Sequence, residues 1–303
     1  MTNARMDDSP RLREILDRLS AMSIEDYYNP YQMFQWPDTL PEDMWWMSPE
    51  LTTTFETEVA EELTREQLFA LSRFESVNFY SLNVHGIREL LIEITERIHT
   101  DDFASASEFF HHFIGEENEH MWFFAEFCQR YGGKIYKQLR GGAETVPPGE
   151  AASLLVFARI LIFEELVDHF NVRMASDERL DDTIRQINRI HHQDESRHIA
   201  FGRELVKVLF ERFRSRATQE ELDEVRGYLG RYLTYSFETL FNPQVYRDAG
   251  IPNPLEVRRR LLEGPRRHEF EAQVFRKTLP YLTKIGLVTH ETGSAVPSVE
   301  AAQ

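Results

Sequence analysis

The sequence predicts an all-α protein centred on a four-helix bundle, with extra helices toward the C-terminus and an irregular, aromatic N-terminal strap. Three observations lead to this prediction. Long segments with helical patterning follow one another from Thr64 onward, the connections between the first four are short, and no strand-like alternation lasts more than a few residues. Short connections between long helices favour antiparallel neighbours, as in a bundle.

Residues 1–50 are rich in aromatic residues and prolines. The prolines argue against helix there, apart from a short piece near residues 9–22. We therefore expect this segment to lie as a strap over an apolar surface of the helical domain. The alternative interpretation is that the strap forms one wall of a substrate pocket.

Capping signals place the starts of the bundle helices. Thr64 with Gln67, and Ser105 with Glu108, have the spacing of a capping box. In a capping box the side chain of each residue accepts a hydrogen bond from the backbone N–H of the other. Asp177 is placed to cap the fourth helix. The four helices are therefore expected near residues 64–100, 105–131, 150–175 and 177–214.

The helical pattern continues after the bundle in shorter pieces. Thr218 and Glu221 form another capping box at the start of a fifth helix, prolines then interrupt the chain, and a last helix covers roughly residues 265–284. We expect residues 51–289 to form one helical domain with a C-terminal extension. Residues 290–303 are expected to be a disordered tail.

Composition limits the classes of partner. The net charge of -17 at pH 7 argues against nucleic acid, because phosphate binding requires clustered lysine and arginine. No apolar run is long enough to span a membrane, and the N-terminus lacks the apolar core of a signal peptide. The single cysteine, Cys128, allows no disulfide framework and no cysteine-based metal site, and it favours a cytoplasmic location.

Two Glu-x-x-His pairs are the most informative chemical feature. Glu117 and His120 fall in the second predicted helix, and Glu195 and His198 fall in the fourth. The two residues of each pair lie on one helix face, on neighbouring turns. In four-helix bundles, two such pairs and one further glutamate from each of the other two helices hold a carboxylate-bridged pair of metal ions. One pair arises easily by chance, whereas two pairs on alternate helices of a bundle are specific.

His191 extends the second pair. It lies one turn before Glu195 on the same helix face and would supply a third imidazole ligand. The other interpretation is a buried histidine that bonds to the backbone. We favour the ligand, because an unpaired imidazole among carboxylates would be a costly way to fill a core.

Residues at equal distances from the turn between two antiparallel helices lie at the same height along the bundle. This comparison identifies the glutamate that the first helix would contribute. Glu89 and Glu117 lie at similar distances along the chain from the turn near residue 102, so we expect Glu89 to be a ligand. Glu93 is the nearest alternative. Glu75 lies on the same stripe but at the wrong height.

In the third helix, Glu164 and Glu165 both lie at a suitable height. Glu164 shares its face with mostly apolar residues, whereas Glu165 shares its face with Asp168 and His169. We therefore prefer Glu164 as the ligand, with Glu165 as the alternative.

Charged residues next to the ligands suggest how the histidines are oriented. Glu116 and Asp194 each come directly before a predicted ligand, and a metal-bound histidine usually donates its second N–H to a carboxylate. We expect each of them to orient the histidine of the opposite half, the alternative being plain surface charge. Arg197 could offset the negative charge of this cluster.

These donors are carboxylate oxygens and imidazole nitrogens, which suit iron or manganese rather than structural zinc. Two ions held close together can bind both oxygen atoms of reduced O2, and seven protein ligands leave coordination positions open. The sequence therefore predicts a dinuclear centre with oxygen chemistry.

With these residues in hand, the chain resembles the ferritin-like diiron N-oxygenases, the group typified by p-aminobenzoate N-oxygenase and chloramphenicol arylamine oxygenase. The third histidine from the last core helix marks this group, and the resemblance covers about residues 50–215, although residues 85–89 match only loosely. The residues that carry it are Glu117-x-x-His120, Glu164 and His191-x-x-x-Glu195-x-x-His198.

The resemblance implies a ferritin-like fold, two iron ions with manganese possible, and O2 as co-substrate. It implies oxidation of a small-molecule amine at nitrogen to hydroxylamine, nitroso or nitro, in secondary metabolism and with an unidentified electron donor. We also expect a homodimer. A diiron C–H hydroxylase or desaturase is the alternative, because fold and ligands do not separate these activities. A non-catalytic iron-binding protein is the least favoured reading.

Overall fold

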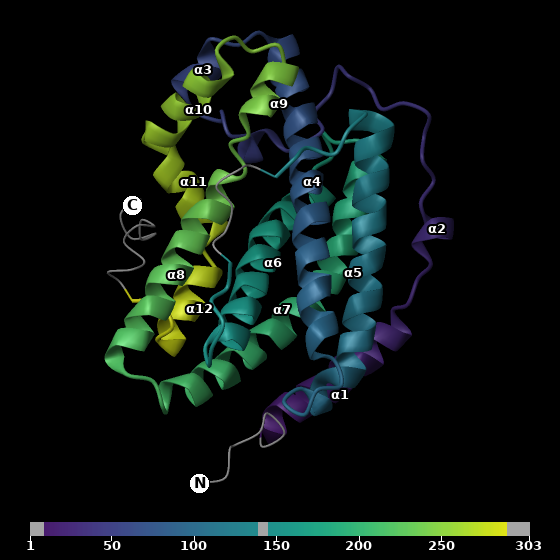
Figure 1. Cartoon of the computed structure of the whole chain (residues 1–303). Helices are drawn as coiled ribbons and strands as arrows, with labels where there is room; N and C mark the ends of the chain where they lie inside the picture. The colour runs from purple at the N-terminus through teal and green to yellow at the C-terminus, as the bar shows by residue number, and fades with distance from the viewer. Residues whose placement is uncertain (1–8, 139–144, 290–303) are drawn as a thin grey trace.

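The computed structural model describes residues 9–138 and 145–289. Four long helices form its centre (Figure 1), and they are α4 (Arg65–Arg97), α5 (Ser107–Phe127), α6 (Ala152–Ser176) and α7 (Asp182–Arg214). Within the described residues no strand is present, and the only β-type pairing is an isolated bridge between Trp45 and Leu180. The all-α prediction is therefore confirmed.

The bundle is built from two helical hairpins. Helix α4 packs along α5, and α6 packs along α7, with the more extensive contact in the second hairpin. Each connection is too short to cross the bundle, so the helices it joins run antiparallel. In the part of the chain that the structure describes, every helix is too short or too polar to span a membrane.

Two predicted helix starts are confirmed. Thr64 and Gln67 form a complete capping box at the start of α4, and Thr218 and Glu221 form another at the start of α8 (Gln219–Glu238). In each case the hydroxyl oxygen accepts from the N3 backbone N–H while the N3 side chain accepts from the N-cap N–H.

The other two predicted starts were wrong. The predicted Ser105–Glu108 box does not form, because a 3-10 turn over Ala104–Ala106 comes first and α5 begins at Ser107. Asp177 lies at the C-terminal end of α6, and Asp181 caps α7 by accepting from the backbone N–H of Thr183. Asp177 and Asp181 are close in sequence, and either side chain could cap a helix. Asp181 is the cap because the backbone places it directly before the first turn of α7.

The C-terminal helices pack on the α4 and α6 side of the bundle (Figure 1). The single helix expected near 265–284 is divided in two, with a break around Phe275. The tail predicted for residues 290–303 lies outside the described residues. The helices after α8 are α9 (Pro243–Asp248), α10 (Pro254–Glu263), α11 (Arg266–Val274) and α12 (Thr278–Ile285).

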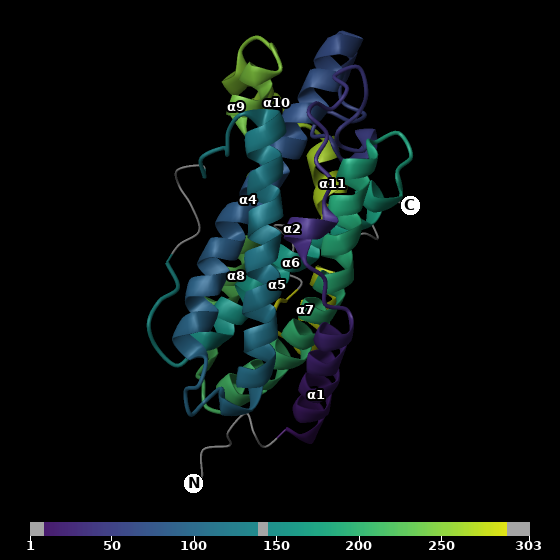
Figure 2. The same ribbon diagram turned by 90° about the vertical axis from the view of Figure 1, so that its right-hand side faces the viewer.

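The N-terminal segment crosses the opposite side, over α5 and α7 (Figure 2). Its first helix is longer than the piece expected near 9–22, because Ser9 caps it and no proline follows until Pro30. Aromatic side chains attach the segment to the bundle, as where the rings of Phe34 and Phe123 lie 5.2 Å apart. Its short elements are α1 (Pro10–Glu25), α2 (Pro30–Met33), a 3-10 turn (Pro49–Leu51) and α3 (Glu58–Glu61).

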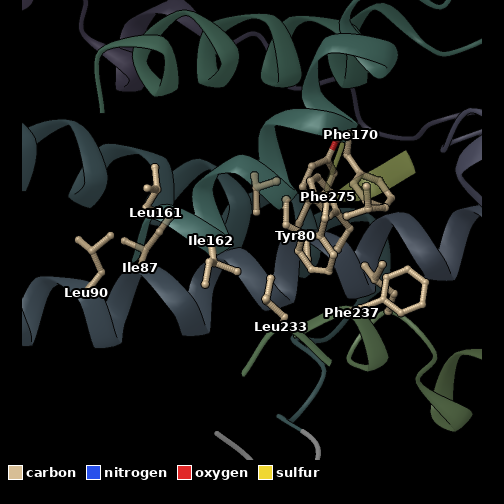
Figure 3. Packing of buried hydrophobic residues seen from close by; sticks show 14 of the residues in the cluster. Tyr80, Ile87, Leu90, Leu161, Ile162, Phe170, Leu233, Phe237 and Phe275 are labelled. Atoms are coloured by element: carbon tan, nitrogen blue, oxygen red, sulfur yellow. The ribbon is translucent and has the colours of Figure 1, made fainter. Parts of the chain in front are cut away.

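One continuous apolar core joins the bundle to the C-terminal helices. Figure 3 shows it extending from Ile87 and Leu90 of α4 to Phe237 and Phe275 of the C-terminal part. Tyr80 lies at its centre, fully buried, and its hydroxyl accepts from the Asn188 side chain. The core therefore fixes how the helices are rotated and how they are aligned in height.

Candidate metal centre

Six of the seven predicted ligands come together inside the bundle. They form two groups of possible metal-binding atoms that share Glu195, and in each group the atoms lie within 4.8 Å of one another. All six side chains are buried. The first group is His120, His191 and Glu195, and the second is Glu117, Glu164, Glu195 and His198.

Helical periodicity produces this convergence. His191, Glu195 and His198 succeed one another on the inward face of α7, since residues three and four apart share a face. Glu117 and His120 do the same on α5. The two carboxylates lie between the imidazoles.

Glu195 presents one oxygen to each group. Its Oε1 lies 2.7 Å from Nε2 of His191 and 3.8 Å from Nδ1 of His120, while its Oε2 lies 3.8 Å from Nδ1 of His198. Glu117 is arranged in the same way, with Oε1 2.7 Å from Nδ1 of His198 and Oε2 3.7 Å from Nδ1 of His120. Both carboxylates can therefore bridge two ions.

Although some of the inward-facing atoms lie 2.7 Å apart, they are not aligned for hydrogen bonds and have no hydrogen-bond partner. Buried polar atoms in native proteins are nearly always bonded, so a concentration of unbonded ones at one place indicates a ligand-binding site. Both donor types, carboxylate oxygen and imidazole nitrogen, suit a pair of iron or manganese ions. The unpartnered atoms are Glu117 Oε1, His120 Nδ1, both carboxylate oxygens of Glu164, His191 Nε2, Glu195 Oε2 and His198 Nδ1.

The outward-facing ring nitrogens, by contrast, are bonded. Nε2 of His120 lies 2.9 Å from Asp194 Oδ2, and Nε2 of His198 lies 2.7 Å from Glu116 Oε2. Asp194 of α7 thus holds a histidine of α5, and Glu116 of α5 holds a histidine of α7. This arrangement fixes each ring and leaves Nδ1 free for a metal. Arg197 donates to both carboxylates, at 2.5 Å from Asp194 and 2.8 Å from Glu116.

His191 is held by a residue that the sequence reasoning did not identify. The side-chain amide of Asn171 lies 2.7 Å from Nδ1 of His191 and is fully buried. The amide nitrogen Nδ2 faces the ring in the structure; the flipped amide, which has the same shape, would place its oxygen there to accept the Nδ1 proton and would leave the Nε2 lone pair for a metal. The available signal was a lone amide two turns after Glu164 on an otherwise apolar helix face.

A second unidentified residue comes from the N-terminal segment. The Tyr28 hydroxyl donates to Asp194 Oδ2 at 2.8 Å, across 166 residues of sequence. Burial, followed by the charge of Asp194, raises the pKa of Tyr28, so the hydroxyl stays protonated and remains a donor. No local pattern within the strap distinguishes Tyr28 from the other tyrosines beside it.

The electrostatics of the cluster favour cations. Burial, followed by the charge of Glu195, raises the pKa of Glu164 well above its usual value. Burial opposes charge on His120, yet its hydrogen bond to Asp194 and the charges of Glu117 and Asp194 raise its pKa to about 10. A bound divalent ion reverses both tendencies, because it stabilises the carboxylate and competes for the imidazole nitrogen.

The structure does not bring Glu89 to the cluster. Its side chain is 45% exposed, and its carboxylate accepts from Arg159 at 3.4 Å and from Gln138 at 3.1 Å. The comparison of distances from the turn gave the position of Glu89 along α4, but it did not consider the direction in which the side chain points about the helix axis. Each residue turns a helix by about 100°, so Glu89 faces roughly 200° away from the buried Ile87.

The alternative glutamates also lie elsewhere. Glu93 pairs with Arg97 at 2.7 Å, and Glu75 is buried against Thr53, whose backbone N–H donates to it at 3.1 Å. Glu165 bonds to Arg203 at 2.6 Å and to Thr278 at 2.7 Å, so it faces away from the cluster. Of the glutamates on α6, only Glu164 joins the described groups.

A cavity of about 300 Å³ lies between α4 and α6. Arg159 and Tyr232 form part of its wall, with the guanidinium 4.8 Å from the centre of the tyrosine ring. Ile160 and Phe163 also line it, and Phe163 directly precedes Glu164. Glu89 and Glu93 also line it, and none of the six clustered residues does, so the cavity lies on another face of these helices than the metal cluster.

Comparison with known proteins gives one family. The sequence model of the family described as P-aminobenzoate N-oxygenase AurF matches residues 9–286. No curated protein sequence matches at the significance level applied.

Among solved structures, R2-like ligand-binding oxidase with aerobically reconstituted Mn/Fe cofactor is 14% identical, with a TM-score of 0.44, over 88% of this chain and 94% of that chain. A mutant of that oxidase with anaerobically reconstituted Mn/Fe cofactor matches with the same TM-score, identity and coverage.

Proposed function

The chain belongs to the p-aminobenzoate N-oxygenase AurF family, and we propose that it is a non-haem diiron monooxygenase that oxidises the nitrogen of a small-molecule amine. The products would be hydroxylamine, nitroso or nitro compounds. The observation that carries the proposal is the buried cluster of three carboxylates and three imidazoles whose inward atoms lack partners. Six residues would hold the two ions, namely Glu117, His120, Glu164, His191, Glu195 and His198.

When bound, two iron ions would supply the electrons and the coordination positions that O2 activation requires. Manganese fits the same donors. The protein's own residues hold the geometry: Glu117 and Glu195 would bridge, and Asp194 and Glu116 fix two of the rings. Aromatic rings keep water out, as where Phe113 lies 4.2 Å from the ring of His198.

The cavity between α4 and α6 supports a small polar substrate. Arg159, which pairs with Glu89 at 3.4 Å, and Tyr232 give the cavity a polar wall, whereas an acyl chain would need a long apolar tunnel. None of the six clustered residues lines the cavity, so the cavity supports a polar substrate through its own wall and not through contact with the metal ligands. These features favour an amine oxygenase over a fatty-acyl hydroxylase or desaturase.

The proposal includes an external electron donor, a homodimer, and a cytoplasmic location in secondary metabolism. The single buried cysteine fits a reducing compartment. The net charge of -17 fits a cationic donor protein better than an anionic one.

A direct test is to load the protein with ferrous iron and expose it to isotopically labelled O2 with aryl and alkyl amines, running fatty acyl substrates alongside. Label on nitrogen in the product supports the proposal. Label on carbon, or only a dehydrogenated acyl product, moves the assignment to a hydroxylase or desaturase. Hundreds of irons per assembly, with no product, indicates storage.

A further inference from the structure

The face of α4 nearest the metal cluster carries no carboxylate. Tyr80 of α4 stacks on Phe124 of α5, with ring centres 5.1 Å apart, which aligns the two helices in height. Because the helices are antiparallel, Ile87, seven residues after Tyr80, lies level with Glu117, seven residues before Phe124. The buried residues of α4 around this level are Asn83, Ile87 and Leu90.

This face departs from the usual arrangement, in which each of the two partner helices contributes one glutamate. Helix α6 contributes Glu164. Helix α4 presents Ile87 and Leu90, which belong to the apolar core (Figure 3), while Glu89 is engaged by Arg159. The centre therefore has three carboxylates rather than four among the described residues.

The missing carboxylate makes the two metal positions unequal. Glu117 and Glu195 offer one oxygen to each position. One position adds His198 and both unpartnered oxygens of Glu164, whereas the other adds only the imidazoles of His120 and His191, which bring no negative charge. An unshared carboxylate attracts a divalent cation more strongly than a neutral ring does, particularly in a buried site.

Resting on the proposed metal centre, we infer that the ions bind in order. The position with Glu164 and His198 fills first and tightly. The position with His120 and His191 fills second, binds more weakly, and leaves more of its coordination positions to solvent or a small ligand. Changes around metal ligands typically alter affinity about 10–100-fold, so we expect the two dissociation constants to differ by at least about tenfold.

The test is a titration of metal-free protein with Mn(II), using equilibrium dialysis and electron paramagnetic resonance. The inference expects two resolved affinities and, at one equivalent, the signal of an isolated ion. His191→Ala should weaken only the second affinity, and Glu164→Gln should weaken the first. Circular dichroism verifies that each variant is folded.

Glu89→Gln is the decisive variant, because it should preserve the fold at a side chain that is 45% exposed and it removes the carboxylate of α4 that best matches the cluster in height. Both affinities should stay unchanged. A loss of one equivalent in Glu89→Gln, or two ions binding with the same affinity, overturns the inference while leaving a dinuclear centre intact. Binding of fewer than two ions by the unmodified protein overturns the proposed function as well.

Discussion

Asp194 is the residue whose replacement tests the arrangement around the metal centre most sharply. It accepts from His120 at 2.9 Å and from Tyr28 at 2.8 Å, and it pairs with Arg197 at 2.5 Å. Asp194→Asn keeps the shape of the side chain and removes its charge. His120 then loses the charged carboxylate acceptor that fixes its ring and makes it a better metal ligand.

The expected effect is a loss in metal affinity at the His120 position. Replacing an outer partner of a metal ligand typically costs about 10–100-fold in affinity, which corresponds to roughly 1.4–2.7 kcal/mol. Arg197 keeps Glu116 at 2.8 Å and Asp26 at 3.1 Å as partners, so it is not left as an unpaired buried charge. The fold should therefore survive, as circular dichroism would show.

The assay is the same Mn(II) titration of metal-free protein. Asp182→Asn is the matched control, since it makes the same chemical change on the same helix where the side chain is 95% exposed. Asp194→Asn should weaken the second affinity and Asp182→Asn should change neither. If Asp194→Asn binds both ions as tightly as the unmodified protein does, Asp194 does not orient His120 for a metal and the reasoning fails.

Three further predictions concern single side chains. His191→Ala should keep the fold but slow iron-dependent O2 consumption, and unchanged iron content together with unchanged oxidation kinetics would make His191 an ordinary core residue. Tyr28→Phe removes one hydrogen bond to a carboxylate and should cost roughly 1–2 kcal/mol in the free energy of unfolding, measured with urea on metal-free protein; no loss would mean that the bond contributes nothing. Burial raises the pKa of Glu75 to about 8, despite hydrogen bonds from Thr53, so the folded protein keeps a proton that the unfolded chain releases above its ordinary value of 4.5. The stability that this proton contributes is complete below about pH 4.5 and is lost as pH rises through 8. Glu75→Gln should therefore lose less stability between pH 5 and 8 than the unmodified protein. Parallel curves of unfolding free energy against pH for the two proteins would contradict the assignment.

The sequence was sufficient for the parts of the fold that depend on local patterns. Thr64 and Thr218 cap helices where their capping-box spacing predicted, because those signals act within one turn. The prediction for Asp177 was wrong, since Asp181 is equally able to cap a helix. The path of the backbone between the two residues determines which of them precedes α7. Six candidate ligands could be selected because helical spacing places residues on a shared face.

The remainder of the site depends on contacts that sequence spacing does not encode. Glu89 had the right height but the wrong rotation, and the rotation of α4 is set by core packing around Tyr80 and Ile87. Asn171 and Tyr28 meet the site only through tertiary contacts. Side chains that support a site are therefore harder to predict than its ligands.

The bond between Tyr28 and Asp194 has a consequence for how the protein is made. The strap leaves the ribosome before the bundle does, and its partner Asp194 is synthesised 166 residues after Tyr28. At about 5–20 residues per second, the strap waits on the order of ten seconds or more for α7 to emerge. During that interval its aromatic residues have no bundle to cover. Closure of the strap over the α5 and α7 face is thus a late step of biogenesis, and it can take place only after the helix that carries His191, Glu195 and His198 exists.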